Sequence, residues 1–138
     1  MTKADMATVK AYLGRYSAIS NQIGRHMDQI RFRADQIGSL DDYYIITPAV
    51  RESHERLLAL RDELDQQDRG RIKELEVERD KLVAAVDAVE DPEGREAVRL
   101  HYFQGMAFSE IAEKLCLSER QLYRRLNNKV YPEILRNI

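Results

Sequence analysis

The sequence predicts an all-α protein in which a long antiparallel coiled-coil helical hairpin precedes a C-terminal three-helix helix-turn-helix domain. Two long segments carry apolar residues at a sustained spacing of seven, which is typical of a coiled-coil seam. Thr47-Pro48 and Asp91-Pro92 each place a capping residue before a proline, which is a strong helix-start signal. Charged residues make up 33% of the 138 residues and aromatic residues only 7%, which favours solvent-exposed helices over a thick core. We therefore expect the hairpin at residues 1–90 and the helix-turn-helix domain at residues 91–138.

The first predicted helix runs from about residue 4 to Gly38, where glycine favours a stop. Its seam recurs every seven residues and has a second set of apolar residues between the repeats. The seven-residue set is Val9, Tyr16, Ile23, Ile30 and Ile37, and the complementary set is Tyr12 or Leu13, Ile19 and Met27. A stripe of this kind needs a partner helix to cover it.

The second predicted helix runs from Pro48 to about Val89. Its seam residues fall into two groups of the same spacing, which are Val50, Leu57 and Leu64, then Leu75, Leu82 and Val89. The gap of eleven between the groups coincides with the polar stretch 65–70, which could be a straight exposed segment, a kink or a break. We favour a continuous helix. The Tyr/Ile cluster at 43–46 in the connection could cover the end of the hairpin, which we favour, or form a contact patch.

The hairpin has a thin core, because two helices cannot fully cover each other's apolar stripes. A homodimer or higher oligomer through this hairpin is therefore a prediction of the sequence. Cys116 is the only cysteine, so no intrachain disulfide can form, and a reducing cytoplasm is expected with Cys116 as a small apolar filler. No signal-peptide core or membrane-length apolar run is evident, so we expect a soluble protein of the bacterial cytoplasm without membrane contact.

The last third of the chain has the pattern of two short helices joined by a tight turn. Ile111, Ala112 and Leu115 share one face of the first helix, and Leu122 and Leu126 share one face of the second. Ser118-x-x-Gln121 predicts a capping box at the start of the second helix. A preceding helix from Pro92 to Gln104-Gly105 would complete a three-helix unit. This is the arrangement of a helix-turn-helix, whose second helix enters the DNA major groove.

The charge distribution also indicates DNA contact at this end. Residues 114–138 carry six Lys/Arg against two Glu, whereas residues 1–90 carry 14 Lys/Arg against 17 Asp/Glu. With Leu122 and Leu126 inward, a recognition helix at about 119–130 points four residues outward and places basic residues beside them. The predicted contacts to double-stranded DNA are Ser118, Arg120, Gln121, Arg124, Arg125, Asn128 and Lys129. Arg and Gln can pair with base edges, and flanking Arg and Lys more often neutralise phosphates.

Residues 92–131 resemble region 4 of sigma-70-type transcription factors. The resemblance rests on Arg99-Leu-His-Tyr-Phe-Gln-Gly105, Glu110-Ile-Ala112, Leu115-x-Leu-Ser118, Leu122 and Arg125-Leu126. The whole chain also resembles a family of small phage proteins of unassigned function that join a helical front to such an end. Two positions depart from the pattern: Ala107 replaces the usual Ser or Thr cap, and Cys116 stands where glycine often occupies the turn.

This resemblance implies a phage or prophage transcription regulator whose hairpin self-associates or contacts bacterial RNA polymerase. The alternatives are a DNA-packaging recognition subunit of the small-terminase kind, which usually places its DNA-binding unit first, and a coiled-coil adaptor that binds no DNA. We do not expect an enzyme, a cofactor or a bound metal. His26, His54 and His101 are far apart in the sequence, and no metal-ligand spacing or phosphate-binding glycine loop occurs.

Overall fold

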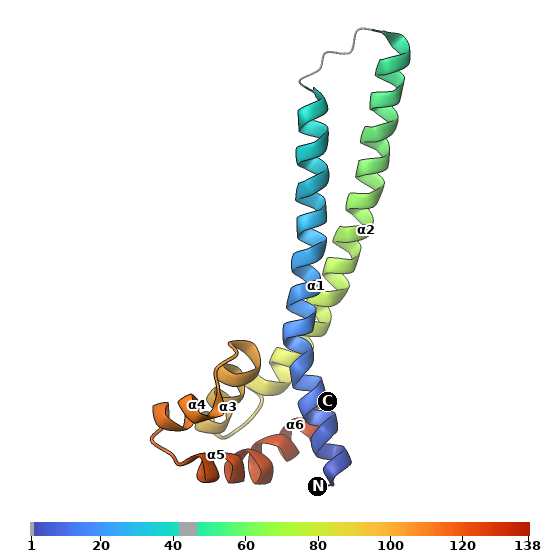
Figure 1. Ribbon diagram of the computed structural model, residues 1–138. Helices are drawn as coiled ribbons and strands as arrows, with labels where there is room; N and C mark the ends of the chain where they lie inside the picture. The colour runs from blue at the N-terminus through green and yellow to red at the C-terminus, as the bar shows by residue number, and fades with distance from the viewer. Residues whose placement is uncertain (1, 42–46) are drawn as a thin grey trace. The chain divides into compact units, whose positions relative to one another are not determined.

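A computed structural model describes the backbone of residues 2–41 and 47–138, with the side chains of 37–41 excepted, and contains helices and no strand within them. The predicted all-α class is confirmed (Figure 1). In chain order the elements are α1 (Lys3–Asp41), α2 (Pro48–Asp87), α3 (Pro92–Val98), η1 (Arg99–Phe103), α4 (Phe108–Lys114), α5 (Glu119–Arg125), η2 (Leu126–Val130) and α6 (Tyr131–Asn137). The η elements are π-helical turns that continue the preceding α-helices without a break.

The helix starts follow the sequence signals, but one predicted stop does not. Thr47 Oγ1 accepts a hydrogen bond from the Val50 backbone N–H at 3.2 Å, as expected of a capping residue. The predicted stop at Gly38 is wrong, because α1 continues to Asp41. A single glycine weakens a long helix by only about 1 kcal/mol, which the rest of α1 tolerates. The predicted role of the 43–46 cluster concerns residues outside those that the structure describes.

The contacts divide the chain into two compact units, one formed by residues up to Ser20 with Glu78–Ile138 and the other by Asn21–Val77. The expected division into 1–90 and 91–138 follows the helix signals, whereas the contacts add the ends of both long helices to the C-terminal unit. The apolar cluster of this unit explains the difference, because helices of seven residues cannot enclose a core alone. Its buried members are Val9, Leu13, Leu82, Val86, Val89, Ala97, Val98, Leu100, Ile111, Ala112, Leu122, Leu126, Val130, Tyr131 and Ile134.

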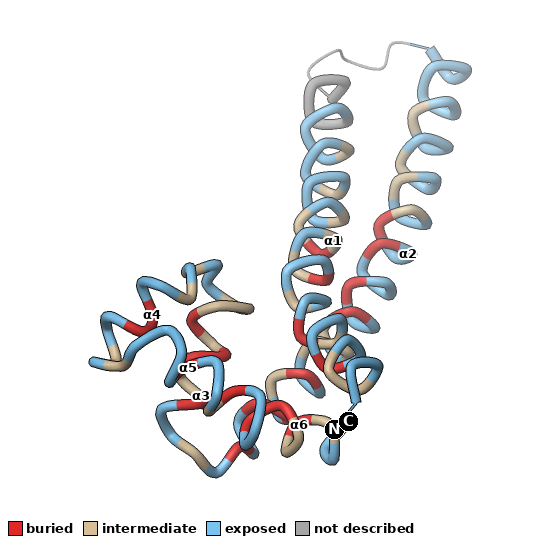
Figure 2. Tube along the Cα trace, turned by 60° about the horizontal axis from the view of Figure 1, so that its bottom comes forward, coloured by how far each residue is buried: buried red, intermediate tan, exposed pale blue. Residues whose placement is uncertain are grey.

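Aromatic side chains complete this C-terminal core, which contains much of the buried (red) chain in Figure 2. The hydroxyl groups of Tyr102 and Tyr131 are hydrogen-bonded at 2.9 Å, and burial raises the pKa of both. Tyr16 of α1 stacks on Phe103 of η1 with ring centroids 4.1 Å apart. The amino end of α1 is therefore part of the helix-turn-helix core.

Gly94 allows α3 to lie directly against η2. A Cβ atom added at Gly94 would lie 2.3 Å from Cγ2 of Val130, a β-branched side chain that is fully buried. We predict that Gly94→Ala destabilises the protein by about 1–3 kcal/mol, the usual cost of overpacking a filled core. Urea unfolding measures the change. Adding Val130→Ala should recover part of the loss, and strictly additive effects of the two substitutions would contradict this contact.

In the other unit, α1 and α2 pair antiparallel. Four polar side chains lie between them and are called the polar layer here: His26 and Arg33 of α1, and Asp65 and Asp68 of α2. Ile23, Ile72 and Leu75 are buried at one side of it. Arg33 Nε donates to Asp65 Oδ1 at 2.9 Å, and the same guanidinium pairs with Asp68. Arg33 pairs with Oδ2 of Asp68, and His26 Nδ1 lies 2.7 Å from the second carboxylate oxygen, Oδ1. The favoured continuity of the second helix through 65–70 is confirmed, but this stretch is not simply exposed, since Asp65 and Asp68 are 7% and 8% exposed.

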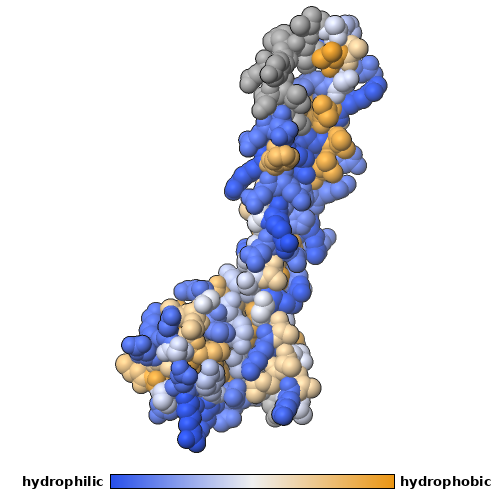
Figure 3. Space-filling model, viewed as in Figure 1, coloured by the Kyte–Doolittle hydropathy of each residue, from blue (hydrophilic) through white to orange (hydrophobic). Residues whose placement is uncertain are grey.

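The predicted seam is wrong at several positions of the hairpin. Met27, Val50 and Leu57 are 41%, 52% and 44% exposed, and the outer hairpin shows apolar (orange) surface in Figure 3. At the polar layer itself, Arg33 of α1 pairs with Asp65 and Asp68 of α2, so charged groups instead of apolar ones lie between the helices at that turn. Phe32 cannot substitute, because it lies on the outer face and is 64% exposed.

The polar layer predicts how stability depends on pH. Burial alone would raise the pKa of Asp68, but the hydrogen bonds from Arg33 and His26 outweigh it and hold that pKa below its ordinary value of about 3.9. A carboxylate with a lowered folded-state pKa stabilises the fold above its unfolded pKa, and this stability is lost as the pH falls through the folded-state pKa. The free energy of unfolding should therefore decrease as the pH is lowered below about 4. Urea unfolding from pH 2.5 to 7 measures this fall, and an equally steep fall in Asp68→Asn would contradict its assignment to Asp68.

Candidate nucleic-acid interface

The helix-turn-helix consists of α4, the turn at 115–118 and α5. Ile111 and Ala112 of α4 and Leu122 of α5 are buried, as their spacing predicts. The Leu117 N–H donates to the Ala112 carbonyl oxygen at 2.8 Å and fixes the end of the turn. Phe108 joins three elements, because its ring stacks on His101 of η1 at 3.7 Å and meets the Tyr123 ring of α5 edge-on at 5.3 Å. These contacts hold α5 at a fixed angle to α4.

The turn carries its strain at Cys116. This residue has φ 58°, the left-handed region that favours glycine, so the unfavourable backbone expected there is present. The prediction that Cys116 fills an apolar space is wrong, because its side chain is exposed. Cys116 lies in the turn between α4 and α5, outside the buried faces of both helices. Ala107 caps α4 without a side-chain hydrogen bond, so the cap expected of Ser or Thr is missing.

Cys116→Gly should stabilise the protein by about 0.5–1 kcal/mol. A non-glycine residue in the left-handed region costs about 1–2 kcal/mol, and part of that gain is offset by the greater freedom of glycine in the unfolded chain. Thermal unfolding under reducing conditions measures the change. Cys116→Ala is the matched control, because it removes the thiol and keeps the Cβ, and it should leave stability nearly unchanged. Equal stabilisation by both variants would assign the effect to the thiol instead of the backbone.

The predicted capping box at the start of α5 is formed in both directions. Ser118 Oγ accepts a hydrogen bond from the Gln121 N–H at 3.1 Å, and the Ser118 N–H donates to Gln121 Oε1 at 2.9 Å. The cap defines where the recognition helix begins. It also bends the Gln121 side chain back toward Ser118, so this side chain has two tasks if it contacts DNA.

The outward face of the recognition helix is where the sequence places it. Leu122, Leu126 and Val130 are fully buried. On the opposite side four polar residues are exposed, namely Arg120, Gln121, Arg124 and Asn128. Among the described residues, neither Arg120 nor Arg124 forms an ion pair. Two guanidinium groups therefore stand one helical turn apart in solvent, with no carboxylate to neutralise them.

Arg125, by contrast, faces the protein. Its Nε lies 3.2 Å from Asp91 Oδ2, and its Nη1 donates to Glu93 Oε2 at 2.5 Å. The two carboxylates come from the start of α3, so this arginine ties the recognition helix to the preceding helix. In the sequence, Asp91 before Pro92 predicts only a helix start, and no local signal connects Glu93 with Arg125.

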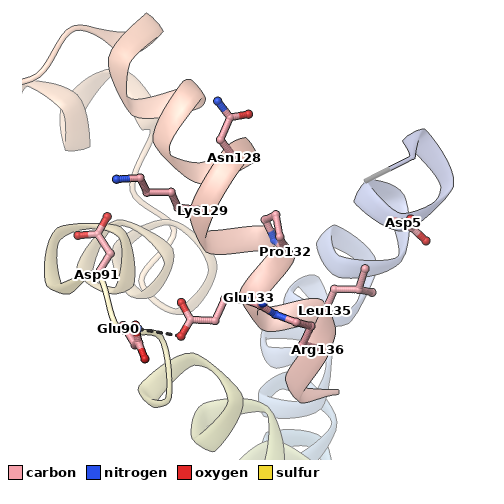
Figure 4. Close-up of a pocket in the computed structure, with 9 residues that line it drawn as sticks. All are labelled: Asp5, Glu90, Asp91, Asn128, Lys129, Pro132, Glu133, Leu135 and Arg136. Atoms are coloured by element: carbon pink, nitrogen blue, oxygen red, sulfur yellow. Dashed lines mark hydrogen bonds between the residues drawn. The ribbon is translucent and has the colours of Figure 1, made fainter.

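Lys129 lies at the edge of a hollow of about 640 Å³ drawn in Figure 4. The hollow also contains Arg136 and four carboxylates, which are Asp5, Glu90, Asp91 and Glu133. Glu133 Oε1 accepts a hydrogen bond from the Glu90 N–H at 3.0 Å, shown as the dashed line. Acidic groups outnumber basic ones here, so the hollow does not suit a phosphate. Asn128 also lines it, but in Figure 4 its side chain points away from the carboxylates.

Three further features bear on function in the described part of the chain: possible metal ligands, the histidines and the apolar length of the helices. No group of three or more His, Cys, Asp or Glu residues there could hold a metal ion. His26 is engaged with Asp68, and His101 Nδ1 lies 2.8 Å from the Met106 carbonyl oxygen. None of the described helices is both long enough and apolar enough to cross a bilayer.

Comparison with known proteins bears on this helix-turn-helix. The family model for ECF sigma factors matches residues 49–129, which is more than half of the chain and includes α3 to α5 with most of α2. The searches of curated proteins and of solved structures found no match. The extent of the family match, together with the formed helix-turn-helix, shows that the chain belongs to the ECF sigma factor family and is a sigma-factor-like DNA-binding regulator.

Proposed function

We propose that this protein is a sequence-specific transcription regulator of phage or prophage type, acting in the bacterial cytoplasm. The helix at 119–130 lies in the major groove of double-stranded DNA, and catalysis has no part in this function. The observation that carries the proposal is the pair of unpartnered guanidinium groups, Arg120 and Arg124, on the exposed face of a helix fixed by a complete capping box. Arginine pairs with the O6 and N7 acceptors of guanine and also binds phosphates.

The assignment to phage or prophage rests on the resemblance of the whole chain to small phage proteins. The family membership supports a promoter as the target and bacterial RNA polymerase as a partner. We propose that the helical hairpin provides the second contact, either to polymerase or to another copy of the chain. The exposed apolar residues Val50, Leu57 and Leu60 on the outer part of α2 support such a contact.

Selection of bound DNA from a random pool tests the proposal, followed by affinity measurements at several salt concentrations. We expect one enriched sequence and an affinity that falls steeply with salt, since phosphate neutralisation releases counterions. Mapping the enriched sequence on the source genome separates the competing functions. Promoter sites support regulation, a single packaging site would indicate a terminase-like subunit, and no enrichment would indicate an adaptor.

The mass of the chain in solution tests the role of the hairpin. A dimer that becomes monomeric in Leu57→Ser/Leu60→Ser would support self-association through α2. A monomeric wild type that binds purified RNA polymerase, with binding lost in the same variant, would support the polymerase contact. A monomer that does not bind polymerase would contradict both roles.

A further inference from the structure

We propose that Gln121 contacts DNA only as a hydrogen-bond donor, and that adenine is selected by Asn128. This inference rests on the proposed DNA-binding function and assigns roles within it. Both amides lie on the outward face of the recognition helix, so composition and helix position do not distinguish them. The hydrogen bonds that the two side chains make within the protein distinguish them.

The Gln121 carbonyl oxygen is already in use. A backbone N–H can only donate, so the amide atom 2.9 Å from the Ser118 nitrogen must be the oxygen, Oε1. Adenine is recognised by an amide that accepts from N6 and donates to N7 at the same time. The capping box turns Oε1 toward Ser118 and leaves only the two Nε2 hydrogens for DNA. Those hydrogens can reach guanine N7 or O6, adenine N7 and thymine O4, but they do not favour adenine over guanine.

In Asn128 both the oxygen and the nitrogen of the side-chain amide remain free to bond a base. Its side chain is exposed and forms no hydrogen bond within the described residues. Figure 4 shows it pointing away from the charged groups of the neighbouring hollow. It lies four residues beyond Arg124, and the two side chains line the same hollow on the recognition helix. This placement allows the paired contact with adenine that the cap denies to Gln121.

A pair of substitutions at Ser118 separates the two functions of Gln121. Ser118→Pro removes the backbone N–H that holds Oε1, and its φ of −73° is one that proline adopts. Ser118→Ala removes the hydroxyl cap and keeps that N–H. Both variants lose the hydroxyl, so they differ in whether Oε1 is released.

The experiment is selection from a random DNA pool with the full chain, after circular dichroism has shown that each variant is helical. Gln121→Ala and Asn128→Ala identify the base pair that each residue contacts, as the position whose preference each variant relaxes. In the wild type we expect adenine over guanine by about tenfold or more at the Asn128 position, and by less than about twofold at the Gln121 position. Ser118→Pro should raise the adenine preference at the Gln121 position by about fivefold or more, and Ser118→Ala should not.

The outcomes separate this inference from the function on which it rests. A wild type that selects no sequence overturns the proposed function. A wild type that selects adenine at the Gln121 position, or none at the Asn128 position, overturns the inference alone. If Ser118→Pro does not fold, the wild-type base preferences at these two positions still decide whether the inference is correct.

Discussion

Replacing both Arg120 and Arg124 by alanine should weaken binding to the selected DNA site by about 2–6 kcal/mol. A paired arginine–guanine contact contributes about 1–3 kcal/mol, and the two side chains are exposed and unpaired, so no protein contact is lost with them. The single variants should each lose about half of this. Titration of labelled DNA at fixed salt measures the affinity, and repeating it with a shuffled sequence shows how much of the loss is sequence-specific.

Arg125→Ala is the matched control on the same helix. Its guanidinium is paired with Asp91 and Glu93 and its side chain is 32% exposed, so its loss should lower stability by less than about 1 kcal/mol. Specific affinity should change much less than in the Arg120 and Arg124 variants. If Arg125→Ala weakened binding as strongly as the double variant, DNA would compete with the carboxylates for this arginine. If the double variant bound like the wild type, another surface would read the DNA.

The sequence predicted the recognition helix well because its signals are local. The Ser118-x-x-Gln121 spacing determines the cap, and the Leu122–Leu126 spacing determines which face turns inward. The family resemblance rests on some of the same residues, Ser118, Leu122 and Leu126 among them. The environment of Arg125 could not be predicted in this way, because its partners lie 32 and 34 residues earlier. A list of basic residues on a helix does not show which of them the fold has already neutralised.

The hairpin likewise contains contacts between distant residues that local sequence patterns do not predict. A spacing of seven correctly predicted two long helices, and Val9, Ile23, Leu75 and Leu82 are buried as expected. The same spacing placed Val50 and Leu57 in the seam, where they are about half exposed. Arg33, Asp65 and Asp68 resemble an ordinary solvated helix face in the sequence. Only the pairing of α1 with α2 shows that they meet one another.

Arg33→Ala should destabilise the protein more than the removal of an exposed arginine of the hairpin does. This arginine pairs with both Asp65 and Asp68, and its removal leaves two carboxylates, on side chains that are 9% and 11% exposed, without their cation. Removing one partner of a buried ion pair is destabilising because it leaves the other charge uncompensated, and solvent reduces this loss here because a fifth of the Arg33 side chain is exposed. Urea unfolding at pH 7 measures the loss.

Two comparisons show whether burial causes this loss. Arg56→Ala removes an exposed arginine that pairs with Glu52 one turn away on α2, and it should change stability by no more than about 0.5 kcal/mol. Replacing Arg33, Asp65 and Asp68 together by leucine should recover most of the loss, because no unpaired carboxylate remains and His26, which loses its partner, is 28% exposed to solvent. An Arg33→Ala variant no less stable than Arg56→Ala would mean that water already solvates both carboxylates. A leucine triple variant as unstable as Arg33→Ala would mean that the charged layer holds the two helices in register, in addition to satisfying its own charges.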